Sequence, residues 1–455
     1  MKKFQIITLT LCLLAAMTGC NNDSEKKEKD SSSESSHSSS DSDSKETSAT
    51  EAATQTTSQN TTEESTTEPS NPKKEVKLLD IDKQIMHESV SSIQYAATLT
   101  EMNCSTASLG KNAAEQYPDL ASSINSISDF YEVNILEQND MYAESAEEAL
   151  SSGEENFETY IFNLNVYVRR ADSVAVSILH DSYDYYGIDA ERRSFWGENF
   201  NTETGETIYL SDVVTDMKEF AKVVEAQLFS DFGADVFYSD TIIEEYFEEY
   251  GADGSHWTLE YNGVTIYFDD GDIAGSGVGD ISVTIEFEDY PELFKEKYTA
   301  GPEAYIVGLP MKSTFYTDLD GDGSSEELII ADSYEGDFGI DRTLSLCIST
   351  PETDYTEKLP ANGCEAYYVK TADDRNYLYV LVELEAQTEL YTFKITNTAI
   401  NKVGKQSISP HYSDQTVSVL TDPDNMHFDI FGNADVEPVG DDFFTVGYDG
   451  MPVMK

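Results

Sequence analysis

Apolar and polar residues alternate along one segment in the first half of the chain. The apolar residues that follow this pattern between Asn156 and Leu179 are Phe157, Tyr160, Phe162, Leu164, Val166, Val168, Val174, Val176 and Ile178. A period of two residues is typical of strands that bury one face. We therefore expect half-buried antiparallel strands here.

Helical patterns lie on both sides of this β-like segment. Val76 to Ile93 predicts an initial strand or short helix, and Leu109 to Ser152 predicts a helix that is interrupted at Tyr117-Pro118, because proline breaks helical hydrogen bonding. Met217 to Phe232 places its apolar residues on one face, and Thr241 to Tyr250 carries an acidic face. We expect these helices to pack on a sheet.

The turns complete the predicted fold. Asp189 to Gly205 is expected to be a loop, Ile208 to Leu210 a strand, and Ser211-Asp212 the cap of the next helix. Trp257 to Phe268 contains an Asn-Gly pair and predicts a hairpin, and Ile281 to Phe287 predicts another strand. From about Pro302 short strands follow, so we predict an α+β fold with an antiparallel sheet and packed helices, followed by a β-rich C-terminal domain.

The N-terminal end has the pattern of a lipoprotein signal peptide, residues 1–19. Two lysines precede an apolar run from Phe4 to Met17, which is too short to span a bilayer, and Thr18-Gly19 precede Cys20. We expect lipid on Cys20 and a protein held on the extracytoplasmic face of the cell membrane. The alternative is that Cys20 is incidental and the protein is secreted.

Composition divides the remaining chain. From Asn21 to about Lys74 there is no Val, Ile, Leu, Met or aromatic residue, so residues 20–75 are expected to form a disordered tether. The part that follows is longer than one core usually organises. We predict an α+β domain at 76–300 and a β-rich domain at 301–455.

The net charge of −59 limits the classes of partner. Such a surface repels nucleic acid and attracts cations and basic proteins, although solubility alone would also explain it. Cys104, Cys347 and Cys364 leave an odd thiol in the folded part, and Cys347 and Cys364 are close enough in sequence to pair.

The segment Asp318 to Glu327 reads as a calcium loop. Its carboxylates alternate with other residues, and Gly321 and Gly323 permit a tight turn. The expected ligands of a structural Ca²⁺ are Asp318, Asp320, Asp322, Ser324 and Glu326. The alternative is an acidic turn that its own backbone hydrogen bonds hold.

No catalytic pattern is visible in the sequence. The histidines have no zinc-like spacing, and neither a nucleophile elbow nor a phosphate-binding glycine loop is present. The residues for a binding face are Tyr185, Tyr186, Arg192, Arg193 and Trp196. The alternative for the aromatic ones is packing within the sheet.

Several segments between Leu78 and Lys297 resemble a known extracellular module. They are Gln116-Tyr117-Pro118, Val168 to Ser173 leading into Ser177-Ile178, Asn201 to Gly205 before Leu210-Ser211-Asp212, and Leu259 to Phe268 with Asp272-Ile273-Ala274. In this order they resemble the extracellular domain of RsiV-type anti-sigma factors and the non-catalytic module of PdaC-type peptidoglycan deacetylases. The Gly-Ala-His-Gly turn usual in that family is replaced by Ile188 to Arg193.

The resemblance implies binding outside the cell. We expect a non-catalytic cell-surface lipoprotein that binds a cationic protein such as lysozyme, or a cell-wall component such as peptidoglycan. The alternative is a cell-wall enzyme, or an accessory module of peptidoglycan modification. A calcium-stabilised spacer is a third hypothesis.

Overall fold

The computed structural model describes the part of the chain that follows the predicted tether. The described residues are 75–153, 157–187, 191–335, 341–348, 354–359, 361, 363–384, 388–408, 415–427 and 443–455. They belong to one compact unit, Pro72–Lys455, which is distinct from Met1–Asn71. The predicted signal peptide, Cys20 and the tether up to Lys74 lie outside the described residues.

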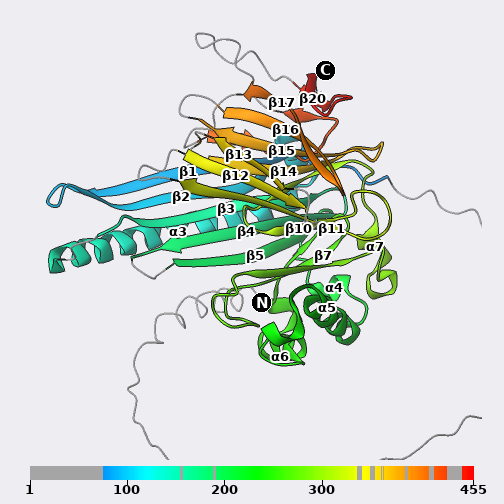
Figure 1. The fold of residues 1–455 in the computed structure, drawn as a ribbon, viewed down its shortest axis with the longest axis horizontal. Coiled ribbons are helices and arrows are strands. Elements are labelled where there is room, and N and C mark those ends of the chain that lie inside the picture. The colour runs from blue at the N-terminus through cyan, green and yellow to red at the C-terminus, as the bar shows by residue number, and fades with distance from the viewer. Residues whose placement is uncertain are drawn as a thin grey trace, which may run out of the picture. The chain divides into compact units, whose positions relative to one another are not determined.

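A six-stranded sheet forms the middle of this unit, in the order β18-β1-β2-β3-β4-β5 (Figure 1). The strands are β1 (Ile81–Ser92), β2 (Ala97–Leu109), β3 (Tyr160–Ala171), β4 (Ala175–Tyr185), β5 (Glu191–Asn201) and β18 (Gln415–Ser418). All neighbours are antiparallel except β2 and β3, which are parallel. The strands expected between Asn156 and Leu179 are confirmed as β3 and β4.

Two helices make the crossover that the parallel pair requires. They are α2 (Lys111–Gln116) and α3 (Pro118–Ser152). Pro118 stands in the first turn of α3, where its missing N–H costs nothing, and Gly153 ends the helix in the left-handed region at φ 89°. The predicted helix with a break at Tyr117-Pro118 is confirmed, and α3 packs on β2 and β3 with Leu120, Ile124, Tyr131 and Ile135 buried.

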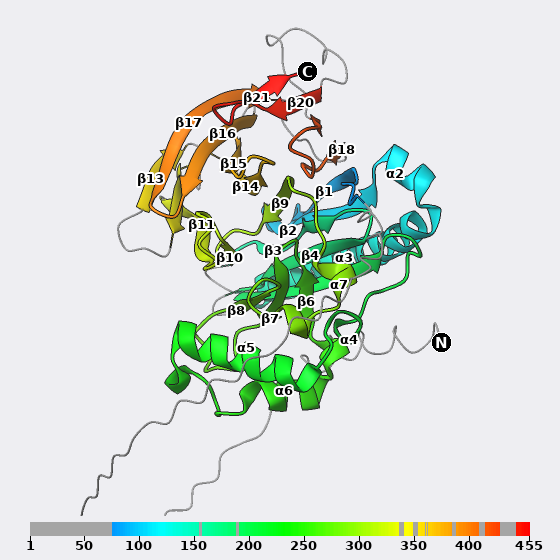
Figure 2. The ribbon, with the colours of Figure 1, turned by 90° about the vertical axis from the view of Figure 1, so that its right-hand side faces the viewer.

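A second, three-stranded sheet lies on the other side of the strands β3 to β5. It consists of β6 (His256–Leu259), β7 (Gly263–Phe268) and β8 (Ile281–Glu286), with α4 (Leu210–Val213), α5 (Met217–Phe232), α6 (Ile242–Tyr250) and α7 (Glu296–Thr299) nearby. Figure 2 shows α5 and α6 on its outer side. Phe220, Val224 and Leu228 of α5 are buried against it, as the apolar face predicted. The Asn262-Gly263 hairpin is confirmed by the pairing of β6 with β7.

Three local predictions are wrong. The segment expected to be a loop from Asp189 contains the strand β5. Both faces of this strand are only partly buried, so its sequence is largely polar and shows no alternation of apolar and polar residues. Ile208 to Leu210 is not a strand, because only one isolated bridge, Phe200–Thr207, forms there and Leu210 begins α4. The cap of α5 is Asp216, whose carboxylate accepts the N–H groups of Lys218 and Glu219.

Residues from Tyr305 onward form strands, as predicted. The strands are β9 (Tyr305–Leu309), β10 (Thr314–Thr317), β11 (Glu326–Glu335), β12 (Asp341–Ile348), β13 (Asp354–Leu359), β14 (Gly363–Lys370), β15 (Asn376–Glu383), β16 (Thr388–Thr396), β17 (Ala399–Ile408), β19 (Met426–His427), β20 (Phe443–Val446) and β21 (Pro452–Met454). The sheet β10-β11-β12-β13 and the sheet β17-β16-β15-β14-β9 enclose one shared apolar core. Cys347 lies in β12 and Cys364 in β14, and their pairing stays a prediction.

The N- and C-terminal parts of this unit are joined by backbone and side-chain contacts. Strand β18 pairs with β1, Lys83 binds Glu365 at 2.6 Å, and Arg169 donates to the Gly308 carbonyl at 2.6 Å. The fold is therefore α+β, with mostly antiparallel sheets and a β-rich C-terminal region. The division at residue 300 into two independently folding domains stays a prediction.

None of the helices in the described residues has both the length and the apolar character that a membrane crossing needs.

Candidate functional site

The predicted calcium loop joins β10 to β11. One carboxylate oxygen from each of Asp318, Asp320 and Asp322 lies within 4.8 Å of the other two. Gly321 and Gly323 have φ angles of 79° and 86°, a region that side chains disfavour, so the glycines allow the chain to turn around this point. Clustered carboxylate oxygens are the ligands that Ca²⁺ prefers.

Backbone N–H groups organise this loop around Asp318. Its carboxylate accepts from Asp320 at 3.1 Å, from Gly321 at 2.6 Å and from Gly323 at 2.9 Å. Burial opposes the charge on Asp318, but these hydrogen bonds outweigh it and hold the pKa of the carboxyl below its usual value. Asp318 is therefore ionised across the physiological pH range.

Ser324 and Glu326 have different positions from the three aspartates. The Ser324 N–H donates to Asp322 at 2.8 Å, and the Glu326 carboxylate accepts the Leu319 N–H at 2.8 Å. Burial, followed by the carboxylates of Asp320, Asp318 and Asp322, raises the pKa of Glu326. The structure thus groups three of the five predicted ligands and places Glu326 at the base of the loop.

Two further contacts attach the loop to the rest of the protein. Asn397, in the turn between β16 and β17, donates its side-chain amide to Asp320. Ser325 donates its hydroxyl to Glu286 of β8, and burial raises the pKa of Glu286. The loop therefore contacts the β6-β7-β8 sheet through Glu286 and the C-terminal sheet through Asn397.

The second predicted group is divided between two faces of the six-stranded sheet. Arg192 pairs with Asp184 and Arg193 with Tyr183, and successive side chains of a strand point to opposite faces. Arg192 and Trp196 share the face that α3 covers, and Tyr185 and Arg193 are on the other. Tyr186, just beyond the end of β4, has its ring 5.9 Å from that of Tyr142 in α3.

Arg193 is held in place by several partners. Two nitrogens of its guanidinium lie 2.8 Å from the two carboxylate oxygens of Asp181, and it donates to the Met311 carbonyl at 2.7 Å. Its charged group also lies 4.5 Å from the centre of the Phe195 ring. Arg193 thereby ties β5 to the segment after β9, whereas Arg192 is exposed.

Trp196 is part of an aromatic group under α3. Its indole N–H donates to the Tyr131 hydroxyl at 2.6 Å, and its ring stacks on His180 at 5.2 Å with an angle of 6°. The Tyr131 hydroxyl in turn donates to Glu198 at 3.1 Å. Glu198 was not predicted as a site residue, although its position two residues after Trp196 in a strand places both on one face.

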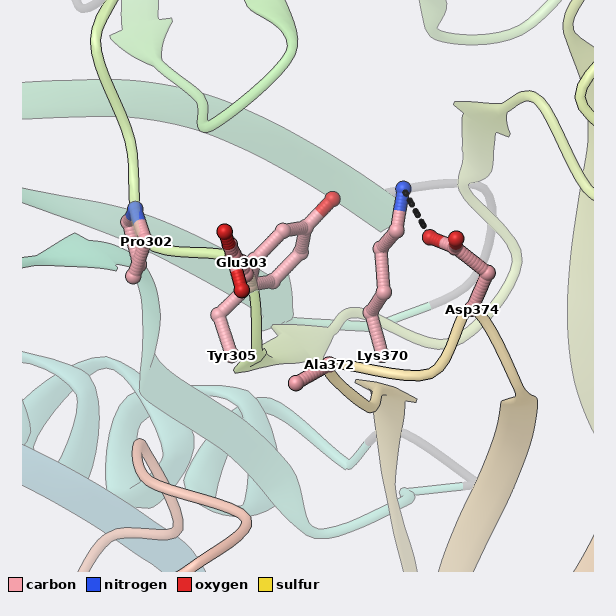
Figure 3. Close-up of a pocket in the computed structure, with 6 residues that line it drawn as sticks. All are labelled: Pro302, Glu303, Tyr305, Lys370, Ala372 and Asp374. Carbon is pink, nitrogen blue, oxygen red and sulfur yellow. Dashed lines mark ion pairs between the residues drawn. The ribbon is translucent and has the colours of Figure 1, made fainter.

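A shallow hollow of about 360 Å³ lies beside β9 and the turn between β14 and β15 (Figure 3). Its lining residues are Pro302, Glu303, Tyr305, Lys370, Ala372 and Asp374. Lys370 and Asp374 lie on the same wall of this hollow, 4.0 Å apart, and face Glu303 and Tyr305 on the other. No pattern in the sequence marks this hollow, because its walls come from segments far apart in the chain.

The basic side chains are largely engaged with the chain's own carboxylates. Residues 75–455 contain 75 Asp and Glu but only 20 Lys and Arg. Among the described residues, the basic side chains in ion pairs include Lys83, Arg169, Arg170, Arg193, Lys222, Arg342, Lys370, Arg375, Lys402 and Lys405. Acidic side chains therefore outnumber basic ones almost fourfold in this part of the chain.

No family model matches the chain, and no curated protein matches it. Two solved structures are similar to part of it. One is a member of the DUF3298 family from Bacteroides fragilis, with 14% identity and a TM-score of 0.38, covering 49% of this chain and 96% of that chain. The other is a DUF3298 family protein from Pseudomonas aeruginosa, with 17% identity and a TM-score of 0.32, covering 49% of this chain and 97% of that chain.

Proposed function

We propose that this protein is an exported, lipid-anchored and non-catalytic binding protein that recognises a cationic protein outside the cell. The observation that carries the proposal is the excess of 75 carboxylates over 20 basic side chains in residues 75–455, where buried or half-buried basic residues such as Arg169, Arg170 and Arg193 already pair within the chain. Such a surface speeds the encounter with a basic partner and disfavours anionic ones. Lysozyme is the first partner to test, because of the RsiV-type resemblance.

The helix α6 offers a compact group of exposed carboxylates for such a partner. Glu244, Glu245, Glu248 and Glu249 are all exposed on this nine-residue helix. Like charges four residues apart, such as Glu244 with Glu248 and Glu245 with Glu249, repel each other, and a bound cationic partner would relieve this repulsion. Tyr238 and Tyr250 beside them are 58% and 52% exposed and offer apolar contact area.

The test is calorimetric titration with lysozyme at low and at moderate salt. We expect saturable binding that weakens with salt but persists at moderate ionic strength. Replacing the four α6 glutamates by glutamine should abolish it. The matched control replaces four exposed glutamates of α3, Glu137, Glu144, Glu147 and Glu148, and should leave most of the affinity. Equal losses in both variants, or binding that vanishes with salt, would reduce the interaction to nonspecific charge attraction.

The anchor is tested separately from the binding. Replacing Cys20 by serine should move the protein from the membrane fraction to the medium without changing its affinity for a cationic protein. Retention of the Cys20→Ser variant on membranes would contradict lipidation at this residue.

A cell-wall component is the alternative ligand. The same titration tests it, with wall fragments in place of lysozyme.

We also propose that the loop from Asp318 to Glu326 binds a structural Ca²⁺. This proposal is supported by three carboxylate oxygens that lie within 4.8 Å of one another in the loop that joins β10 to β11, two strands that a bound cation would hold together.

The alternative function, a cell-wall enzyme, makes a different prediction. In that case, the substitution of one carboxylate would abolish wall turnover without affecting the binding of a cationic protein.

A further inference from the structure

Buried polar atoms without a hydrogen-bond partner gather under the helix α3. Four of those found in the described part of the chain lie there: Oγ1 of Thr100, Oδ1 of Asn139, Nδ1 of His180 and Oδ1 of Asp184. Asn139 belongs to α3, and the other three side chains lie on the face of β2 and β4 that α3 covers. Buried polar groups in proteins are usually paired, so four orphans at one interface indicate that this contact is not optimised for permanent closure.

The first half of this interface is a hydrogen-bond network of three side chains, Trp196, Tyr131 and Glu198. The Tyr131 hydroxyl accepts from the indole of Trp196 at 2.6 Å and donates to Glu198 at 3.1 Å. The Tyr131 ring also lies 4.6 Å from His180. Tyr131 thus links α3 to both β4 and β5, and Glu198, which accepts its hydroxyl, is the group of this network that can change its charge.

The second half lies about two to three turns further along α3. Gln138 donates to the Tyr142 hydroxyl at 3.1 Å, and Tyr142 hydrogen-bonds Asp184. The Tyr142 ring lies 6.4 Å from Phe162 of β3. Asp184 is buried, with its other carboxylate oxygen unpaired. Each half of the interface therefore holds one carboxyl group beneath a tyrosine of α3.

We propose that α3, from Tyr131 to its C-terminal end, is a proton-controlled cover: it is docked on β2 to β5 while Glu198 and Asp184 are protonated, and it opens when both carboxyls are ionised. Opening would expose a surface with aromatic walls and relieve the unpaired polar atoms by hydration. This inference does not rest on the proposed binding of a cationic protein.

The charges around the two carboxyls set the direction of the response. Burial raises the pKa of Glu198 to about 7, against the hydrogen bond from Tyr131. Burial raises the pKa of Asp184 to about 6, against Arg192 and Tyr142. The docked state thus holds these protons more tightly than the open state does. Docking of α3 is therefore strongest at a pH below the ordinary pKa values of carboxyl groups, and it is lost as the pH rises through 6 and 7.

The other titratable groups at the interface do not change charge in this window. Burial lowers the pKa of His180 to about 3 and raises that of the Cys104 thiol of β2 to about 12. Burial also raises the pKa of Tyr131 well above its ordinary value and that of Tyr142 to about 12. Arg192 of β5 is the cation beside Asp184, and β3 contributes Tyr160 near Tyr142. Glu198 and Asp184 therefore control the response.

Hydrogen exchange of the full chain, corrected for intrinsic rates, tests the cover directly. We expect the protection of the amides from Tyr131 to Ser152 to fall at least about tenfold between pH 5 and pH 8, while β14 and β15 keep theirs. Glu198→Gln, which mimics the protonated carboxyl, should remove most of this dependence, and adding Asp184→Asn should remove the rest.

Glu147→Gln is the matched control, because Glu147 is exposed on the same helix. This variant should keep the full pH dependence. Constant protection in the unsubstituted protein, or an unchanged response in Glu198→Gln, would overturn the proposal. A lysozyme titration that fails has no bearing on this result, so the two proposals fail independently.

Discussion

Arg170 and Asp172 form an ion pair of 2.8 Å in which both side chains are 0% exposed. The same guanidinium donates to the carbonyls of Tyr298 at 2.7 Å and Ala300 at 2.6 Å. Asp172 also accepts the N–H groups of Val174 and Ala175, at 2.6 and 3.0 Å. One buried pair therefore fixes the turn between β3 and β4 and the segment that leads to β9.

Replacing Arg170 by methionine should destabilise the protein by about 3–5 kcal/mol, because it leaves the Asp172 charge buried without its partner. Urea unfolding measures the change. The control is Lys222→Met in the exposed Lys222–Glu219 pair, for which we expect no measurable change. Similar losses in the two variants would contradict a special role for the buried pair.

Unfolding of residues 72–455 should be one cooperative transition. Arg169 binds Glu260 at 2.9 Å and the Gly308 carbonyl at 2.6 Å, and so connects the two sides of the expected domain boundary. Differential scanning calorimetry should give equal calorimetric and van't Hoff enthalpies. Two separate transitions would instead support independent domains at 76–300 and 301–455.

Calcium should raise the melting temperature of the protein. At a concentration about 100 times the dissociation constant, binding to the folded state adds about 2.7 kcal/mol. Asp322→Asn should remove this shift, because it removes one of the three converging carboxylates. The exposed Glu144→Gln variant serves as the control and should keep it. A shift of equal size in Asp322→Asn would exclude this loop as the site.

The response of the loop to acid follows from Asp318. Its pKa is below the ordinary value, so the ionised form contributes stability that is complete above the ordinary pKa of 3.8 and is lost as the pH falls through the lowered one. The loop should therefore stay ordered at pH 4. NMR titration of the Gly321 and Gly323 amide signals checks this, and a midpoint above 3.8 would contradict it.

Gly197→Ala should destabilise the protein by about 1–3 kcal/mol through overpacking. A Cβ at this position would overlap the Trp257 carbonyl, where the backbones of β5 and β6 cross. Gly275→Ala is the control, since nothing lies within 4 Å of its Cβ position. Denaturant unfolding compares the two, and equal stability would show that β5 and β6 can separate without cost.

The elements with strong local patterns were predicted from the sequence. Helix α5 has the predicted bounds, Met217–Phe232, and the Asn262-Gly263 turn joins β6 to β7. The strand β2 was not predicted and β5 was expected to be a loop. The strand β5 is covered on one face by α3 and on the other by β6, so its burial depends on elements distant in sequence.

Of the two candidate sites, the sequence predicted the grouping of residues in the calcium loop but not in the binding face. Asp318, Asp320 and Asp322 converge because their alternation is local to one turn, so spacing alone was enough to group them. Arg192 and Arg193, adjacent in sequence, are separated by the sheet between them. No spacing rule could show this, because the strand that carries them had not been recognised.

The sequence by itself determined the acidic character, the class of the fold and the loop that groups three carboxylates, because composition, periodicity and turn chemistry are local properties. Only the tertiary structure decided that Glu198 lies under Tyr131 of α3, and that Arg169 reaches Glu260 and Gly308. The physical reason is that burial sets the pKa of a carboxyl and the strength of an ion pair, and burial arises from segments that meet only when the chain has folded.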